Sequence, residues 1–148
     1  MTPTVEAVSR TDPGLASQLR VSVMRLARRM RNERAESDLT VSQISVLGLL
    51  FRNGEMTVGK VAAQELVQPP TMTRTVNALV EKGYAERRSS ETDGRAVLIS
   101  LSDKGRETVL ADRSRRDAWL ARQLKGLTPE ERELLRDVAP LIERLATT

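Results

Sequence analysis

The sequence predicts a mainly α-helical protein with a small β-hairpin (α+β): a winged helix-turn-helix joined to a helical dimerisation region, assembled as a homodimer. Three observations predict this fold class. A short amphipathic helix is closely followed by a second one that opens with two prolines. Two strand-like runs around an Asp-Gly pair come next, which favours a hairpin. Helical patterns with apolar stripes lie at both ends of the chain, outside the winged helix.

Composition narrows the classes of protein to which the chain can belong. Charged residues make up 30% of it, with 8 Gly and 6 Pro, as in ordered, soluble, helix-rich proteins. Cys and His are absent, which excludes disulfides, thiol switches, thiolate or imidazole metal sites and the commonest general base. There is no glycine-rich phosphate loop, no signal peptide and no apolar run near the roughly 18 residues of a membrane span. We expect a cytoplasmic, nucleoid-associated protein of a bacterium or archaeon, without cofactor or metal, that is not an enzyme.

The net charge of +4 gives only weak support for a polyanionic partner. Of the 24 basic residues only 4 are Lys, and a GC-rich genome would produce the same excess of Arg. Between Gln68 and Arg95, five basic residues oppose four acidic ones, a net charge of +1. Such a small excess favours specific geometry over bulk attraction to DNA.

The first helix is predicted from apolar residues with helical spacing at Leu15, Leu19, Val23, Leu26 and Met30. Residues 1–13 before it resemble a flexible arm. We expect the helix to continue to about Glu36. Its other face is rich in arginine, and a solvated face is favoured there over a phosphate-binding stripe.

The helix-turn-helix follows. Thr40 and Gln43 predict a capping box at the start of a second helix, which Gly54 would close in a left-handed conformation. Residues 56–57 predict a minor strand that pairs with the wing, and residues 58–65 a third helix. The residues expected to point inward from this helix are Val61, Ala62 and Leu66.

The recognition helix is predicted to begin at Pro69 and Pro70, because proline at the first helical positions loses no hydrogen bond. It would end at Gly83, a strong C-cap. One face is apolar, with Met72, Val76, Leu79 and Val80. The other carries Thr71, Arg74, Thr75 and Ala78. Arginine can pair with a guanine edge, threonine with a base or phosphate, and a methyl group can touch thymine, so this face suits the DNA major groove.

The wing and the C-terminal helices complete the chain. Residues 84–88 and 96–101 predict two strands. A long helix from about residue 103 is predicted to break at Gly126, and its charged stretch 112–117 to be exposed or to lie across a partner. A last helix begins at the Thr128 capping box, and Pro140 predicts a kink or a local break in it. The apolar stripes of the terminal helices require burial, which a symmetric dimer would provide. We therefore predict a dimerisation region at 14–38 and 103–148, and a DNA-binding domain at 39–102.

Four runs of residues occur in a specific order: PPTMTR at 69–74, LVEKGYAER at 79–87, DGR at 93–95 and LSDKG at 101–105. Together they closely resemble the MarR (multiple antibiotic resistance regulator) family, over about residues 15–145. The resemblance implies a triangular homodimer and a transcriptional regulator, usually a repressor, that binds a pseudo-palindromic operator. The residues it would place in the major groove are Pro70, Thr71, Thr73 and Arg74.

The resemblance also assigns roles outside the recognition helix. Arg95 would enter the minor groove, held by Asp93, although Gly94 departs from the commoner arginine of the family pattern. Arg87 and Arg88 would contact phosphates or pair with Glu86 or Glu91. A crevice between the DNA-binding and dimerisation regions would bind a small aromatic or anionic effector. Its candidate residues are Met24, Arg28, Leu47, Phe51 and Trp119, for each of which ordinary packing is the favoured explanation.

Two alternatives remain beside a sequence-specific regulator. An architectural DNA-binding protein of low specificity would discriminate little between operator and random DNA, whereas a specific regulator should show a gap of at least about a thousandfold. For Arg74, the alternative to a guanine contact is an ion pair with Glu81. An enzyme finds no support in the sequence, because no candidate nucleophile, base or paired carboxylates can be recognised.

Overall fold

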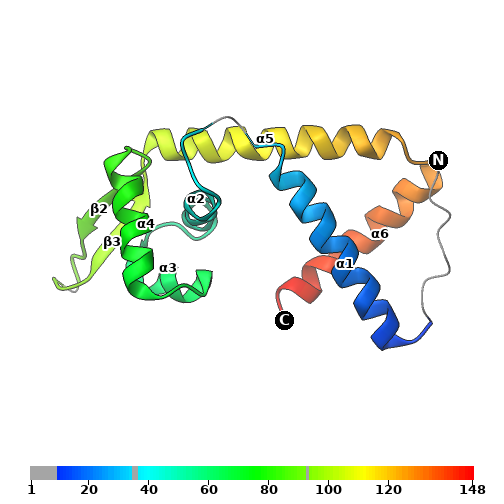
Figure 1. Cartoon of the computed structure of the whole chain (residues 1–148), viewed down its shortest axis with the longest axis horizontal. Coiled ribbons are helices and arrows are strands. Elements are labelled where there is room, and N and C mark those ends of the chain that lie inside the picture. The colour runs from blue at the N-terminus through cyan, green and yellow to red at the C-terminus, as the bar shows by residue number, and fades with distance from the viewer. Residues whose placement is uncertain (1–9, 35–36, 93) are drawn as a thin grey trace. The chain divides into compact units, whose positions relative to one another are not determined.

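The computed structural model describes residues 10–34, 37–92 and 94–148 (Figure 1). Contacts divide the chain into a terminal helical unit, residues 1–34 with 115–148, and a winged-helix unit, residues 35–114. Helix α5 (Asp103–Lys125) contributes to both units. No helix in the described part of the chain is long and apolar enough to cross a membrane. The functional boundaries predicted above, including the 1–13 arm, stay a prediction.

The terminal helical unit contains α1 (Asp12–Arg31), the second half of α5, and α6 (Pro129–Ala146). The capping box at the start of α6 is confirmed: the Thr128 hydroxyl accepts from the Glu131 N–H at 3.1 Å, and the Glu131 carboxylate accepts from the Thr128 N–H at 2.8 Å. The helix continues through Pro140, so the local break predicted there is not found. The capped start and the remaining backbone hydrogen bonds hold the helix across the one position that lacks a donor.

The bounds of α1 differ from the prediction at both ends. The helix begins at Asp12 rather than Leu15, because the Thr11 hydroxyl accepts from the Gly14 N–H at 3.3 Å and caps an earlier first turn. It ends at Arg31, with Asn32 as C-cap, rather than near residue 36. Apolar periodicity identified the helix, whereas its ends are set by capping groups that periodicity does not reveal.

The terminal helical unit leaves most of its large apolar side chains exposed. Neither α1 nor α6 contains a buried residue along its described length. The exposed side chains are Leu15, Leu19, Val21, Val23, Met24 and Leu26 on α1, and Leu134, Leu135, Val138, Leu141, Ile142 and Leu145 on α6. Within the described residues of this unit, Trp119 is the buried large apolar side chain, with the Arg29 guanidinium 5.0 Å from its ring centroid.

The winged-helix unit has the predicted order of elements: α2 (Val41–Asn53), β1 (Met56–Thr57), α3 (Val58–Glu65), α4 (Pro69–Glu81), β2 (Ala85–Ser89), β3 (Val97–Leu101) and the first half of α5. The strands form an antiparallel sheet in the order β1-β3-β2, in which Met56 and Arg87 both pair with Ile99. The hairpin and the minor strand are therefore confirmed.

One apolar core joins the helices and the sheet of this unit. Its completely enclosed side chains are Val46, Leu47, Val61, Met72, Val76, Leu79 and Ile99. The capping box that starts α2 is also confirmed, since the Thr40 hydroxyl accepts from the Gln43 N–H at 3.2 Å and the Gln43 amide oxygen accepts from the Thr40 N–H at 3.0 Å. These bonds at its start, and the Gly54 N–H that donates to the Leu50 carbonyl at its end, fix the helix that supports α3 and α4.

The turn between α3 and α4 contains a leucine where glycine is the usual residue. Leu66 has φ 54° and ψ 42°, in the left-handed region, and its side chain is 93% exposed. The prediction that Leu66 points inward is wrong, because the chain leaves the helix at this residue and the apolar spacing no longer applies. Gly54 has the expected positive φ of 75°, but its ψ of −156° lies outside the left-handed helical region.

The start of α5 is packed tightly against the end of α4. The Ser102 hydroxyl accepts from the Gly105 N–H at 3.0 Å and donates to the Gly83 carbonyl at 2.5 Å. A Cβ atom on Gly105 would lie 2.0 Å from the carbonyl oxygen of Tyr84, so the position accommodates only glycine. The run LSDKG is therefore a packing motif as well as a helix start.

The charge of the middle of α5 predicted an exposed stretch, but part of this stretch is buried in the single chain. Asp112 is 6% exposed. It lies one turn after Val109, whose side chain is part of the winged-helix core, and so shares the inward face of α5. The Arg113 guanidinium lies 4.2 Å from the centroid of the Phe51 ring. Contact with an aromatic ring allows this part of the charged stretch to pack.

Candidate nucleic-acid interface

Helix α4 is held in place from one side, as predicted. Met72, Val76 and Leu79 are 2%, 1% and 0% exposed, and each faces the core. On the opposite side, Pro70, Thr71, Thr73 and Arg74 are exposed. The helix therefore presents a polar surface whose position is fixed by the packing behind it, as a helix that reads DNA requires.

The threonines of α4 do not act as helix caps. Gln68 is the N-cap, and its side chain forms no capping hydrogen bond. The Thr73 hydroxyl donates to the Pro69 carbonyl at 3.0 Å, and the half-buried Thr75 hydroxyl donates to the Thr71 carbonyl at 3.1 Å. Because their protons are already used within the helix, Thr73 and Thr75 can offer a ligand only acceptor lone pairs.

Arg74 does not form the ion pair with Glu81 that we considered as its alternative. Within the described residues, no carboxylate lies within ion-pair distance of its guanidinium. The side chain is exposed on the outward face, as are those of Thr71 and Thr73. Its five N–H donors therefore remain available to an external acceptor such as a guanine edge or a phosphate.

The two arginines of β2 are held by different parts of the unit. The Arg88 guanidinium makes a two-pronged ion pair with Glu55, next to β1, and not with Glu86 or Glu91. This contact lowers the pKa of the Glu55 carboxyl, chiefly through the hydrogen bond from Arg88, and raises that of Arg88. The pair joins the two edge strands across β3, so Arg88 braces the wing.

Arg87 reaches in another direction, toward α4. Its guanidinium donates to the side-chain amide oxygen of Asn77, an exposed residue of the recognition helix. Asn77 was not among the residues predicted from the sequence to contact DNA. The signal that could have found it was its spacing, because it follows Arg74 by three residues and Thr73 by four, and so shares their side of the helix.

The wing tip is only partly described. Arg95 is exposed in the loop between β2 and β3, which the Ser90 N–H closes by donating to the Ala96 carbonyl at 2.9 Å. Asp93, predicted to hold Arg95, lies outside the described residues. The roles assigned to Asp93 and Arg95 therefore stay predictions.

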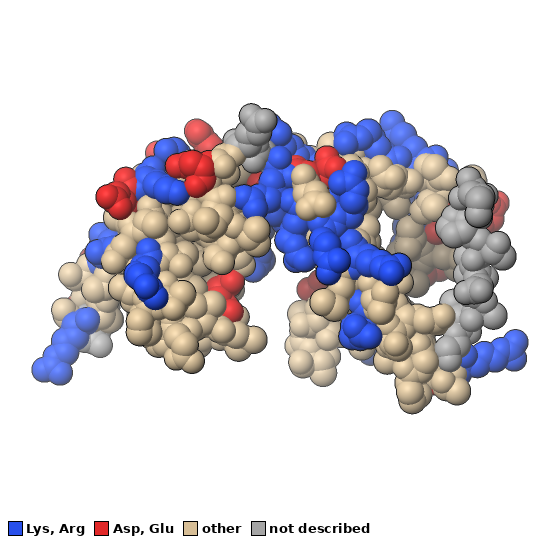
Figure 2. All heavy atoms as spheres, in the orientation of Figure 1, with Lys and Arg blue, Asp and Glu red and all other residues tan. Residues whose placement is uncertain are grey.

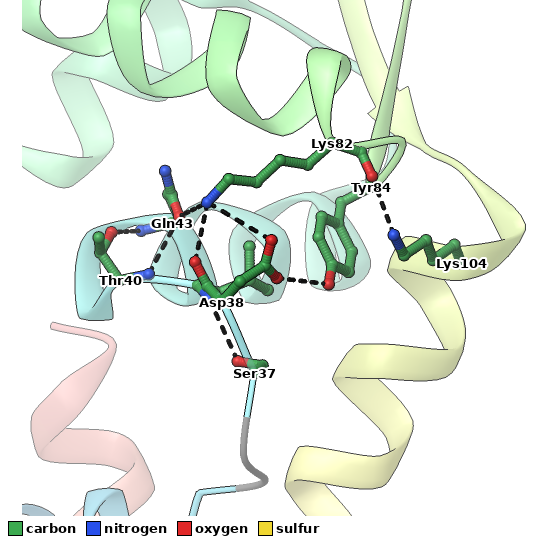
Figure 3. A network of polar contacts seen from close by, with 8 residues as sticks. Ser37, Asp38, Thr40, Gln43, Lys82, Tyr84 and Lys104 are labelled. Carbon is green, nitrogen blue, oxygen red and sulfur yellow. Dashed lines mark hydrogen bonds and ion pairs between the residues drawn. The ribbon is translucent and has the colours of Figure 1, made fainter.

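A polar network fixes the C-terminal end of α4 (Figure 3). The Lys82 ammonium donates to the backbone carbonyl of Asp38 at 2.8 Å and to the Gln43 amide oxygen at 3.5 Å. The Tyr84 hydroxyl donates to the Asp38 carboxylate at 2.9 Å, and the Lys104 ammonium donates to the Lys82 carbonyl at 2.9 Å. The segment that enters α2 is thereby tied to the junction of α4 and the wing.

The titration of two groups reflects this network. The pKa of the Asp38 carboxyl is lowered, first by the hydrogen bond from Tyr84 and then by the positive charge of Lys82. The pKa of the Tyr84 hydroxyl is raised, first by burial and then by Asp38. Both shifts favour the state in which the carboxylate is charged and the phenol is protonated, which is the state that forms the hydrogen bond.

The candidate effector residues belong to two different units. Leu47 is completely buried in the winged-helix core, and Phe51 is half-buried, with Arg106 and Arg113 at its ring. In the terminal helical unit, Met24 is 54% exposed, Arg28 is exposed, and Trp119 is buried beside Arg29. The crevice itself stays a prediction. Among the described residues, no group of His, Cys, Asp or Glu side chains could hold a metal ion.

The winged-helix unit is not basic overall. Residues 35–114 carry ten Lys and Arg against eleven Asp and Glu, a net charge of −1. Figure 2 shows acidic and basic side chains interspersed on the visible face of this unit. Attraction by net charge therefore contributes little here, and the positions of individual donors matter more.

A recognition helix seated on a closed core, preceded by a short helix and followed by a β-hairpin, defines a winged helix-turn-helix protein. A family model described as the MarR family matches residues 39–97. An uncharacterized HTH-type transcriptional regulator of Mycobacterium leprae (strain TN) is 42% identical over 135 residues, which are 91% of this chain and 94% of that protein. The chain belongs to the MarR family and is a DNA-binding transcriptional regulator.

Two further similarities are relevant to function. The HTH-type transcriptional repressor MdtR of Bacillus subtilis (strain 168) is 32% identical over 124 residues, covering 79% of this chain and 78% of that protein. The crystal structure of Streptococcus pneumoniae FabT in complex with DNA has a TM-score of 0.68 at 23% identity, covering 92% of this chain and 99% of that one. At this identity, the second similarity shows a shared fold.

Proposed function

We propose that the protein is a sequence-specific repressor that binds a pseudo-palindromic operator as a homodimer, and that it has no catalytic activity. The observation that carries this proposal is the outward face of α4, where Arg74 has no ion-pair partner among the described residues and Met72, Val76 and Leu79 hold the helix from behind. Base reading needs donors whose positions are fixed, and this helix provides them.

The homodimer is supported by the apolar surface of the terminal helical unit. The large side chains of α1 and α6 are exposed in the single chain, and the surface is hollowed along α1 between Leu15 and Ser22. A second copy is the proposed occupant, because a two-fold pair would cover identical stripes on both chains and present two α4 helices to the two half-sites of an operator.

Repression and DNA binding are supported by the relatives. MdtR is a transcriptional repressor by name, and the FabT crystal structure is a complex with DNA. We extend both properties to this chain. Within this proposal, Pro70, Thr71, Thr73, Arg74 and Thr75 lie at the major groove, and Arg95 with Asp93 at the minor groove. Release by a small aromatic or anionic effector and a cytoplasmic, nucleoid-associated location complete it.

Selection of bound sequences from a random DNA pool tests the proposal. We expect an inverted repeat with half-sites about 10 bp apart, one helical turn. Arg74→Ala should remove the preference at one position of each half-site, a loss of about 1–3 kcal/mol of discrimination. Arg74→Lys keeps the charge but not the two-pronged geometry, and should restore affinity without restoring preference. Arg25→Ala, an exposed arginine of α1, is the matched control.

The second candidate is an architectural DNA-binding protein, which the near-neutral charge of the winged-helix unit disfavours. Such a protein would bind the random pool without enriching any motif. A ratio of specific to non-specific affinity below about tenfold would establish this alternative and exclude the repressor, for which we expect at least about a thousandfold.

A further inference from the structure

Asn77 occupies a position on α4 from which it could read a base. It is exposed, follows Arg74 by three residues and Pro70 by seven, and so lies on the outward face with both. Its backbone is rigid, because its neighbours Val76 and Leu79 are 1% and 0% exposed and seat the helix on the core. Asparagine is also one of the few side chains that can both donate to and accept from a base edge.

The contact with Arg87 fixes the orientation of this amide. Arg87 lies two residues after the buried Ala85 and therefore on the same face of β2. Its side chain is exposed and reaches Asn77 of α4. A guanidinium has donors and no acceptor, so the group of Asn77 that faces it must be the amide oxygen. The amide nitrogen, with two N–H donors, then points away from Arg87.

We propose that Asn77 is a specificity-determining residue that Arg87 orients so that it donates to a base edge. The inference rests on the proposed function. An unrestrained asparagine pairs with adenine by donating to N7 and accepting from N6. Here Arg87 uses one of the two lone pairs of the amide oxygen, and its positive charge disfavours a second donor there, so the side chain chiefly presents donors and favours an edge that carries acceptors. Guanine, with N7 and O6, and thymine, with O4, offer such edges, whereas adenine adds an opposing donor.

Arg87 is accordingly a positioning residue. Its guanidinium has five N–H donors, of which the Asn77 contact uses only a part, so a phosphate contact is compatible with this role. The two roles differ in what they affect. A phosphate contact changes affinity for all sequences equally, whereas a positioning contact changes which base is preferred.

The test is selection from a random DNA pool with the full-length protein and four variants. Asn77→Ala should lose preference at one position of each half-site, by about tenfold, and leave the positions read by Arg74 unchanged. Asn77→Asp keeps a partner for Arg87 but replaces the donor by an acceptor, so the preferred base should change to cytosine, whose N4 donates. Arg87→Ala frees the amide oxygen and should admit adenine, and Arg87→Lys should restore the original preference.

The outcomes separate this inference from the function on which it rests. If the unmodified protein enriches an inverted repeat and the Asn77 variants enrich the same bases at every position, the inference is overturned and the proposed function stands. Uniform weakening by Arg87→Ala, without a change of base, overturns the positioning role. If the unmodified protein enriches no motif, the proposed function fails first. Circular dichroism and thermal melting of each variant establish that it is folded.

Discussion

The two units of the chain bury their apolar residues in different ways. The winged-helix unit closes a core around α2, α3, α4 and the sheet, in which Leu47, Leu79 and Ile99 are all 0% exposed. The terminal helical unit has equally apolar stripes on α1 and α6 but no buried residue in either helix. The first unit therefore buries its apolar residues through its own contacts, whereas in the proposed homodimer the second copy would cover those of the second unit.

In a DNA-binding protein, the unit with the recognition helix is expected to be the more basic one, but here it is the less basic one. The terminal helical unit carries fourteen basic residues against nine acidic ones, a net charge of +5, while the winged-helix unit carries −1. The positive balance of the whole chain thus comes from the unit that does not contain the recognition helix. Net charge is a property of the sequence that indicates little about where DNA binds in this molecule.

The largest effect is expected from substitutions on α6 that disrupt the proposed dimer and leave the winged-helix unit folded. Leu141 and Leu145 are 51% and 71% exposed in the single chain, so charged substitutions there would be harmless to a monomer. In the proposed dimer, Leu141→Asp with Leu145→Asp should raise the dimer dissociation constant at least about a thousandfold, because burial of each leucine contributes about 1.5–3 kcal/mol and symmetry doubles the change. Analytical ultracentrifugation measures this. Glu143→Lys, on the polar side of α6, is the control, and an unchanged dissociation constant of the leucine variant would refute the two-unit comparison.

The next largest effect is expected from a substitution that destabilises the winged-helix unit. Gly105→Ala places a methyl group 2.0 Å from the Tyr84 carbonyl oxygen, so the backbone of α5 or of the α4–β2 junction must move. We expect a loss of about 3 kcal/mol in the free energy of unfolding, measured by denaturant titration. Gly59→Ala, where nothing lies within 4 Å of the added atom, is the matched control. Equal stability of the two variants would contradict the close packing.

A smaller effect should be stabilising. Leu66→Gly removes the strain of a leucine at φ 54° and loses almost no buried surface, since that side chain is 93% exposed. The gain at the left-handed position exceeds the entropy that glycine adds to the unfolded chain, so we expect about 0.5–1 kcal/mol of stabilisation. Thermal melting tests this expectation, and a lower melting temperature would show that Leu66 is covered in the assembled protein.

The smallest effect concerns pH. The pKa of Asp38 in the folded protein lies below its ordinary value of 3.8, so its contribution to stability is fully present above that value and is lost as the pH falls through the lowered pKa. Asp38→Asn should therefore lower the melting temperature near neutral pH and flatten its decline at the acidic end, so that the two proteins converge at low pH. A decline equally steep in both proteins would show that Asp38 does not contribute to it.

The fold could be predicted largely from local patterns. Apolar spacing identified α1, α2 and α4, and the capping boxes at Thr40 and Thr128 marked two helix starts correctly. The misses have several causes: a local cap at Thr11 moved the start of α1, and others depend on backbone conformation or packing. Leu66 leaves the helix pattern because of its left-handed backbone conformation, and Asp112 is buried because it shares a face of α5 with the buried Val109. Neither property is encoded in a residue's immediate neighbours.

The candidate site was predictable in part. The outward face of α4 followed from its apolar side, which determined where Arg74 points. The contacts of Arg87 with Asn77 and of Arg88 with Glu55 were not predictable, because the first depends on how β2 lies against α4 and the second on the reach of Arg88 across β3. Alternation along a strand predicts that neighbouring arginines face opposite sides, but not what each side contains.

The internal pairing of Lys82 with Asp38 and of Arg88 with Glu55 has a consequence at the scale of the genome. Cations already satisfied within the protein displace few counterions from a random stretch of duplex. The protein should therefore dissociate quickly from non-specific DNA, and a larger fraction of its molecules should be free. If the protein is the proposed repressor, fewer copies per cell would then suffice to keep its operator occupied.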